Sequence, residues 1–428
     1  MNARRFYLHA YGCQMNVYDG DCLAELLLGA GWQQTDLAEA DAAILLGCSV
    51  RASAESRLWG NLTQLWKWKQ EQQGRILALG GCTGEREAQA ILARIPHLDI
   101  VFGTGSLGQV PELLERAQAG ERLSCIGEAD YDAGGRISPV SAFVAVMRGC
   151  DNFCTYCVVP GARGRERSRK VASILAEVEA RMVAETREIT LVGQNVNSYL
   201  NDGVNFAGLL RAVAATGIPR IRFTTNHPKD LTRELIATMA SLPNICPALH
   251  LPAQSGSDAV LRRMNRGYTR VGYLAKVEMA RSILPNLGLT TDLMVGFPGE
   301  SEDDFAATLE LVRLVRYDAA FLFKYNPRPG TPAFTMEDDV PPAVKQARLG
   351  ELITVQAEIT REVNQLLVGN LEDVLVEGTA RKGGLRGRIP RGQVVNFGGD
   401  AHPGEFVQVR IVSGSGHTLK GEWSKKRA

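Results

Sequence analysis

The sequence predicts an α/β protein in three parts: an N-terminal domain built on a parallel sheet, a partial (β/α)6 barrel and a small C-terminal β-barrel. Strand and helix signals alternate in two successive series along the 428 residues, and such alternation is typical of parallel sheets. After Gly369 the pattern changes to short β-like runs divided by glycines, which predicts a small barrel. We therefore expect domains at residues 1–127, 137–368 and 369–428.

The composition is that of an ordinary globular protein. Hydrophobic residues make up 45% of the chain and charged residues 22%, with a formal net charge of +1. The first residues lack the apolar region of a signal peptide, and no uncharged apolar run is long enough to span a membrane. We therefore expect a cytoplasmic protein with no membrane partner, in a reducing compartment where free thiols can serve as metal ligands.

Apolar runs in the N-terminal domain predict strands at residues 5–10, 42–46, 76–79 and 99–102, with helical patterns between them that include 21–28 and 51–73. A cysteine follows each of the first three strands: Cys13, Cys48 and Cys82. Parallel strands place the loops that follow them at one edge of the sheet. Three cysteines at three strand ends can therefore converge on one metal, although chance placement would give the same pattern.

The second series predicts strands at residues 142–147, 189–192, 220–224, 248–251, 289–295 and 321–325. Six successive strand–helix units indicate an incomplete form of the parallel barrel that normally has eight. A linker rich in glycine and in small or polar residues, 131–138, precedes this series. A long helix at about 344–367 follows it.

The strongest single motif is Cys150-X3-Cys154-X2-Cys157, directly after the first barrel strand. Three closely spaced thiolates can hold a four-iron cluster and leave one iron open to bind another molecule. A zinc site would need a fourth ligand at a ribbon or finger spacing, and the sequence has none. A disulfide framework suits small secreted domains, and chance clustering of core cysteines is the remaining alternative.

Two basic segments are candidates for contact with an anionic partner. Arg163, Arg165 and Arg167 lie close together after the cysteine motif, where a salt-bridged helix start is the alternative. The segment from residue 371 to the C-terminus holds ten Lys or Arg against six Asp or Glu, including Arg381, Lys382 and Arg388. A phosphate-binding face or a solvated surface would both give this composition.

The run from Gly103 to Gly108 has the spacing of a dinucleotide-binding fingerprint. It follows the fourth predicted strand instead of opening the domain, and Pro111 lies close behind it. A nicotinamide or flavin site is therefore only the minor alternative for this domain.

Several motifs make the chain similar to the radical S-adenosylmethionine methylthiotransferases, and within that family to the enzymes that modify tRNA. The cysteine motif is the superfamily signature, and Gln14-Met15-Asn16 differs from the relative that modifies a ribosomal protein. The other motifs are Tyr11–Asn16, Gly149–Pro160, Leu191–Tyr199, Leu249–Ser257 and Met264–Arg270.

The resemblance implies a methylthiotransferase domain, a radical S-adenosylmethionine core and a C-terminal TRAM domain. It implies S-adenosylmethionine and two [4Fe-4S] clusters as cofactors, with Cys13, Cys48 and Cys82 as ligands of the second cluster. It also implies transfer of a methylthio group to C2 of N6-isopentenyladenosine at position 37 of tRNA. The partners would be the anticodon stem-loop and an external electron donor, and we expect a monomer. The residues expected to contact S-adenosylmethionine are Gln194, Asn195, Asp292 and Gly296.

The sequence departs from the family pattern at three places: Leu46-Gly47 in place of Asn-Thr, Gly161-Ala162 in place of Tyr-Thr, and Thr83-Gly84-Glu85 in place of a Met-Ala-Gln-like run. These changes bear on the cluster pocket and on the grip on the substrate, but they remove no cysteine. Two other functions stay open from the sequence. One is methylthiolation of threonylcarbamoyladenosine tRNA or of a ribosomal protein, and the other is a non-enzymatic iron–sulfur protein.

Overall fold

The computed structural model describes residues 4–50, 52–127 and 140–426, which fall into two compact units. The first unit comprises the N-terminal domain together with residues 143–151 and 157–169. Of the described residues, the second comprises 140–142, 152–156 and 170–426. The predicted linker at 131–138 lies outside the described residues. Among the described residues, no helix is both long and apolar enough to cross a membrane.

The first unit is built on a parallel sheet that has, in the described chain, the strand order β2-β1-β3-β4-β5-β6. All four strands predicted for this domain are present. The strands are β1 (Arg5–Ala10), β2 (Gln33–Gln34), β3 (Ala42–Gly47), β4 (Ile76–Gly80), β5 (Ile100–Phe102) and β6 (Leu123–Cys125).

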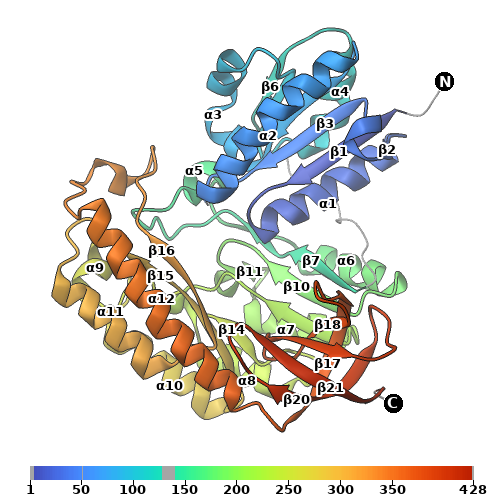
Figure 1. Ribbon diagram of the computed structural model, residues 1–428. Helices are drawn as coiled ribbons and strands as arrows, with labels where there is room; N and C mark the ends of the chain where they lie inside the picture. The colour runs from blue at the N-terminus through green and yellow to red at the C-terminus, as the bar shows by residue number, and fades with distance from the viewer. Residues whose placement is uncertain (1–3, 51, 128–139, 427–428) are drawn as a thin grey trace. The chain divides into compact units, whose positions relative to one another are not determined.

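Helices cover both faces of this sheet (Figure 1), as the alternation of side chains along β3 shows. Ile44 and Leu46 pack with α1 (Gln14–Gly29) and α4 (Val110–Gln118). Ala43 and Leu45 pack with α2 (Ala52–Glu71) and α3 (Gly81–Arg94). Because β3 is buried on both faces, its sequence is a continuous apolar run. The α1 helix begins at Gln14, well before the predicted residue 21. The sequence did not reveal this start because Cys13, at the N-cap, makes no side-chain capping bond.

The second unit carries the barrel strands, and their places match the prediction closely. They are β7 (Ser141–Ala145), which begins in this unit and ends in the first, β10 (Glu188–Val192), β13 (Arg220–Phe223), β14 (Ala248–His250), β15 (Gly288–Val295) and β16 (Ala319–Lys324). They form sheets of order β13-β10-β7 and β14-β15-β16, and β10–β13, β14–β15 and β15–β16 pair in parallel.

Helices alternate with these strands, as the (β/α) prediction requires. They are α6 (Val171–Val183), α7 (Phe206–Ala215), α8 (Arg233–Ser241), α9 (Asp258–Arg263), α10 (Arg270–Ile283) and α11 (Glu302–Val315). A short hairpin of β11 (Leu200–Asn201) and β12 (Val204–Asn205) follows β10. The start of α11 is fixed by a capping box in which Ser301 and Asp304 satisfy each other's backbone N–H groups.

After α12 (Pro342–Gln365) the chain closes a five-stranded barrel of order β17-β18-β19-β21-β20 within the described residues. The strands are β17 (Leu371–Thr379), β18 (Leu385–Arg388), β19 (Val394–Gly398), β20 (Phe406–Ser413) and β21 (Thr418–Lys426). The sequence indicated β17, β19 and β20 but not β18 or β21, because a glycine interrupts the apolar alternation of each missed strand, Gly387 in β18 and Gly421 in β21. In the same unit, Arg220 of β13 donates to the Arg388 carbonyl at 2.9 Å and to Asp373 at 3.0 Å.

Candidate metal centres

The three cysteines at the strand ends of the first unit lie together. Cys13 caps α1, Cys48 follows β3, and Cys82 lies in the first turn of α3 after β4. Two effects raise the pKa of the Cys13 thiol well above its usual range: first a hydrogen bond with Cys48, and second the burial of the thiol. Glycine at position 12 lets the Cys48 side chain pack against the backbone next to Cys13. A Cβ on Gly12 would lie 2.6 Å from the Cys48 sulfur, and the φ of +101° at this position also favours glycine.

Asn16, in the first turn of α1, ties the ends of two strands to this site. Its side-chain amide donates to the carbonyls of Tyr11 and Gly47, each at 2.9 Å. Its Oδ1 lies 3.9 Å from the Cys82 sulfur, which donates to it. The sequence motif Tyr11–Asn16 contained this residue, but nothing in the sequence assigned it a role.

Arg163, at the end of α5 (Val159–Arg163), reaches into the same site. Its Nε donates to the Cys82 sulfur at 3.2 Å, and its Nη2 donates to Asn16 at 2.9 Å and to Asp19 at 2.8 Å. The side chains of Arg163 and Asp19 are only 3% and 1% exposed. Burial opposes the charge, but Asp19, Cys82 and Cys13 outweigh it and raise the pKa of Arg163. The sequence places Arg163 among the residues expected to contact RNA, whereas its side chain is buried here and bonded to Cys82, Asn16 and Asp19.

The site has the donor set and the open hydrogen-bonding capacity that an iron–sulfur cluster needs. Thiolate sulfur is the soft ligand that such clusters use. Nη1 of Arg163 is buried with no hydrogen-bond partner, so it can donate to an acceptor that the cluster brings. Among the described residues, no three His, Cys, Asp or Glu side chains already stand in a metal-binding arrangement. The role of these cysteines as ligands therefore stays a prediction.

Two departures from the family pattern meet beside this site. A Cβ on Gly47 would lie 2.6 Å from Thr83 Oγ1 and 2.7 Å from Leu58. In this chain, Thr83 and Leu58 therefore fill the space that a side chain at position 47 would need. Thr83 Oγ1 is itself buried without a hydrogen-bond partner.

The cysteine motif of the barrel is divided between the two units. Cys150 and Cys157 belong to the first unit. There β8 (Met147–Arg148) pairs antiparallel with β9 (Arg167–Ser168), and the Cys150 N–H donates to the Gly164 carbonyl at 3.3 Å. The Cys157 sulfur accepts a hydrogen bond from the Val159 N–H at 3.5 Å. The first unit therefore holds the ends of the motif on either side of residues 152–156.

Cys154 belongs to the second unit, where Arg266 holds it. Nη1 of Arg266 donates to the Cys154 sulfur at 3.2 Å, and Nη2 donates to the Pro252 carbonyl at 3.1 Å. Arg266 is buried, and although burial opposes its charge, Tyr156, Tyr268 and Cys154 raise its pKa. The motif Met264–Arg270 contained this arginine, so its membership of a motif was the signal that could have found it.

Three of the four predicted cofactor residues have defined contacts: Asn195 after β10, Asp292 within β15 and Gly296 after β15. Asn195 is buried, and its amide donates to Asp230 at 2.8 Å while its Oδ1 has no partner. Oδ2 of Asp292 lies 3.4 Å from Nε2 of His250. Gly296 has a φ of +69° and donates its N–H to the Glu300 carboxylate. Gln194 directly follows the second barrel strand β10 and is half-buried.

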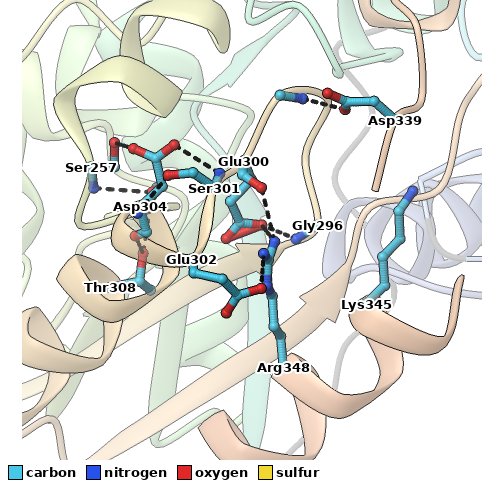
Figure 2. A network of polar contacts seen from close by, with 12 residues as sticks. Ser257, Gly296, Glu300, Ser301, Glu302, Asp304, Thr308, Asp339, Lys345 and Arg348 are labelled. Carbon is cyan, nitrogen blue, oxygen red and sulfur yellow. Dashed lines mark hydrogen bonds and ion pairs between the residues drawn. The ribbon is translucent and has the colours of Figure 1, made fainter. Parts of the chain in front are cut away.

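The Gly296 contact belongs to a larger polar network at the end of β15 (Figure 2). Glu300 is buried, and Arg348 of α12 lies 3.5 Å from its carboxylate. Burial raises the pKa of Glu300 to about 7, against the opposing effects of the Gly296 hydrogen bond and the Arg348 charge. Arg348 also pairs with the exposed Glu302 at 2.6 Å. Sequence reasoning stopped at Gly296 and missed this carboxylate.

The remaining residues predicted to contact RNA differ in exposure. Arg165 is 71% exposed and pairs with Asp151 at 3.0 Å, and Arg167 on β9 is also exposed. Arg381 and Lys382 lie exposed between β17 and β18. Arg388 is half-buried, with its Nε bonded to Glu377 at 2.7 Å.

Three family descriptions match successive parts of the chain. The radical SAM superfamily matches residues 144–312, the uncharacterized protein family UPF0004 matches 5–103, and the TRAM domain matches 365–423. Two solved structures share the fold. The radical S-adenosylmethionine methyltransferase TsrM from Kitasatospora setae has a TM-score of 0.58 at 14% identity, covering 78% of this chain and 75% of that one. The cobalamin-dependent radical enzyme OxsB has a TM-score of 0.54 at 13% identity, covering 84% and 56%.

Curated relatives match almost the whole length. The tRNA-2-methylthio-N(6)-dimethylallyladenosine synthase of Geotalea uraniireducens (strain Rf4) is 46% identical over 97% of this chain and 98% of that protein. The synthase of the same name from Parafrankia sp. (strain EAN1pec) is 43% identical over 99% and 90%. At this identity and coverage, the chain belongs to the family of the tRNA-2-methylthio-N(6)-dimethylallyladenosine synthases, within the radical SAM superfamily.

Proposed function

We propose that this protein is a tRNA methylthiotransferase that adds a methylthio group to C2 of N6-isopentenyladenosine at position 37. The observation that carries the proposal is 46% identity over 97% of the chain to a synthase named for this product. The chain also keeps all six cysteines that the chemistry requires, in two separate triads.

The cofactors are two [4Fe-4S] clusters and S-adenosylmethionine. We assign one cluster to Cys13, Cys48 and Cys82 and the other to Cys150, Cys154 and Cys157. When bound, the cluster at Cys150, Cys154 and Cys157 with S-adenosylmethionine would supply a carbon radical that can take hydrogen from an unactivated adenine carbon, and the N-terminal cluster would supply sulfur. An external donor provides the electron.

The protein's own residues hold the cofactor at the carboxyl ends of the barrel strands. Asn195 Oδ1 is a buried acceptor without a partner, so it can accept a hydrogen bond from an amine or hydroxyl of S-adenosylmethionine. At Gly296 the backbone turns at positive φ directly after β15, and the Lys345 side chain fills the space where a Cβ would stand. Asp292 lies within β15 and Gln194 follows β10, and these two residues complete the proposed set.

Exposed cations provide the grip on the anticodon stem-loop. Arg165 and Arg167 lie beside the cysteine motif, and Arg381 and Lys382 lie on the C-terminal barrel. Contacts from such side chains to phosphates give affinity with little sequence reading. We propose that the protein works as a cytoplasmic monomer, with domains at residues 1–127, 137–368 and 369–428.

The test is mass spectrometry of tRNA nucleosides from a strain that lacks the gene and from that strain carrying the wild-type gene. The deletion should accumulate N6-isopentenyladenosine, and the wild-type gene should restore its 2-methylthio form. A gene with Cys150, Cys154 and Cys157 changed to alanine should not restore it. In the deletion strain, loss of a methylthio group from threonylcarbamoyladenosine in the same nucleosides, or from a ribosomal protein in a parallel mass spectrum of the ribosomal proteins, would assign the enzyme to that other substrate. Unchanged modification would leave an iron–sulfur protein without this activity.

A further inference from the structure

Arg163 occupies an unusual place for a basic residue in an arginine-rich run. Its neighbours Arg165 and Arg167 are exposed, whereas its guanidinium lies buried against the cysteines of the N-terminal site. Nε already contacts the Cys82 sulfur at 3.2 Å, and Nη2 is fixed by Asn16 and Asp19. Nη1 is the donor that remains buried without a partner.

We propose that Arg163 is a positioning residue of the N-terminal cluster, with Nε bonded to the Cys82 thiolate and Nη1 bonded to a sulfur that the cluster contributes. The inference rests on the proposed ligands Cys13, Cys48 and Cys82. Its consequence is a cluster with a higher reduction potential than the three thiolates alone would give, because positive charge and hydrogen bonds to sulfur favour the reduced state.

Asp19 makes this geometry possible. A guanidinium that faces thiolates must be held in one orientation, and Asp19 Oδ2 fixes the Nη2 edge at 2.8 Å while Asn16 accepts at 2.9 Å. That leaves Nε and Nη1 on the other edges of the planar group. Lysine has a single nitrogen, so it could replace the charge but not bond the thiolate, the cluster and Asp19 together in this geometry.

Arg148 offers a matched comparison. It donates to the other oxygen of Asp19 at 3.0 Å and to the Thr104 carbonyl at 3.1 Å. It is thus a second arginine on the same carboxylate, and its substitution removes one Asp19 ion pair without removing the contact with Cys82.

The experiment uses the full-length protein with Cys150, Cys154 and Cys157 changed to alanine, so that the N-terminal cluster is the one that remains. Arg163→Met, Arg163→Lys and Arg148→Met are added separately. After anaerobic reconstitution with iron and sulfide, the readouts are iron per chain and the midpoint potential from a redox titration followed by electron paramagnetic resonance. Thermal unfolding of each apoprotein reports whether it is folded.

We expect Arg163→Met to shift the midpoint to a more negative potential, Arg163→Lys to shift it less, and Arg148→Met to leave it at the parent value. Loss of iron from a folded Arg163→Met protein would also support the proposal. A parent-like potential in Arg163→Met, or an equal shift in Arg148→Met, would overturn it. If Arg163→Met does not fold, Arg163→Lys takes its place: a midpoint more negative than the parent's would support the proposal, and a parent-like midpoint would overturn it. A parent protein that binds no iron would instead refute the ligand assignment, and the inference with it.

Discussion

Gly47 and Thr83 fit together because the glycine has no side chain: a Cβ on Gly47 would lie 2.6 Å from Oγ1 and 2.8 Å from Cβ of Thr83. Gly47 ends β3 immediately before Cys48, and Thr83 follows Cys82 on α3. Both positions depart from the pattern of the family. The two departures are therefore one packing change beside the proposed cluster site.

Gly47→Ala should destabilise the apoprotein, because the new methyl group overlaps Thr83 and Leu58 in a close-packed core. Overpacking of this kind costs about 1–3 kcal/mol in the free energy of unfolding. Adding Thr83→Ala should recover part of the loss, since it removes Oγ1 but keeps the Cβ contact. Gly60→Ala on α2 is the control, because a Cβ there meets nothing within 4 Å. Urea denaturation measures the wild type, both single variants, the double variant and Gly60→Ala. An equal loss from Gly47→Ala in the wild-type and in the Thr83→Ala background would contradict the coupling.

Arg266→Met should remove the barrel cluster more readily than the N-terminal one. The substitution deletes the donor to the Cys154 sulfur and leaves the Pro252 carbonyl without that partner. A lost bond of a buried charged group costs about 2–4 kcal/mol, so the loop that carries Cys154 should loosen. Reconstituted protein should bind about half the iron of the wild type. Arg262→Met, at an exposed position on the preceding helix, is the control. This variant should bind as much iron as the wild type.

The two cysteine triads should separate the two halves of the reaction. With Cys13, Cys48 and Cys82 changed to alanine, the protein should still cleave S-adenosylmethionine to 5′-deoxyadenosine under reducing conditions. It should form no methylthio product, because the sulfur source is gone. Chromatography of the nucleosides measures both products in one assay. A methylthio product over several turnovers would place the sulfur source elsewhere.

Glu300 should make stability depend on pH in a particular direction. Its pKa is raised by burial from 4.5 to about 7, so the folded state binds the proton more tightly than the unfolded state. Its favourable contribution is full below pH 4.5 and is lost as the pH rises through 7. As the pH rises from 4.5 to 8, the free energy of unfolding of Glu300→Gln should therefore increase by about 3 kcal/mol relative to that of the wild type. Glu302→Gln, which changes an exposed partner of the same Arg348, should show no such trend in urea denaturation.

The sequence could predict where the cysteines lie but not what surrounds them. Buried parallel strands are continuous apolar runs, so β3 and β4 and the cysteines after them are visible in the sequence. The ion pair of Arg163 with Asp19 joins residues 144 positions apart, and no local pattern specifies it. The arginine run was therefore interpreted as one surface, whereas the fold buries its first member. Glu300 was missed for the same reason, since its pKa depends on burial under α12.

The basic residues of the C-terminal barrel should supply affinity for tRNA through phosphates. Removing the whole barrel would also break the Arg220 contacts to Asp373 and Arg388, so surface substitutions give the cleaner test. Arg381→Gln with Lys382→Gln should weaken tRNA binding at low salt. It should also reduce the slope of log affinity against log salt by about 1–2, one phosphate contact for each lost charge.

Arg388→Gln is the matched comparison, because its guanidinium is already bonded to Glu377 and to the Gly392 carbonyl. It should change the salt slope less than the exposed pair does. Cleavage of S-adenosylmethionine without tRNA should be the same in all three proteins, since the substitutions lie on the C-terminal barrel and outside the cysteine motif. Filter binding of tRNA across a salt series gives affinity and slope together. If the double variant keeps the wild-type values of both, the charge of this barrel faces solvent and the grip on tRNA lies elsewhere.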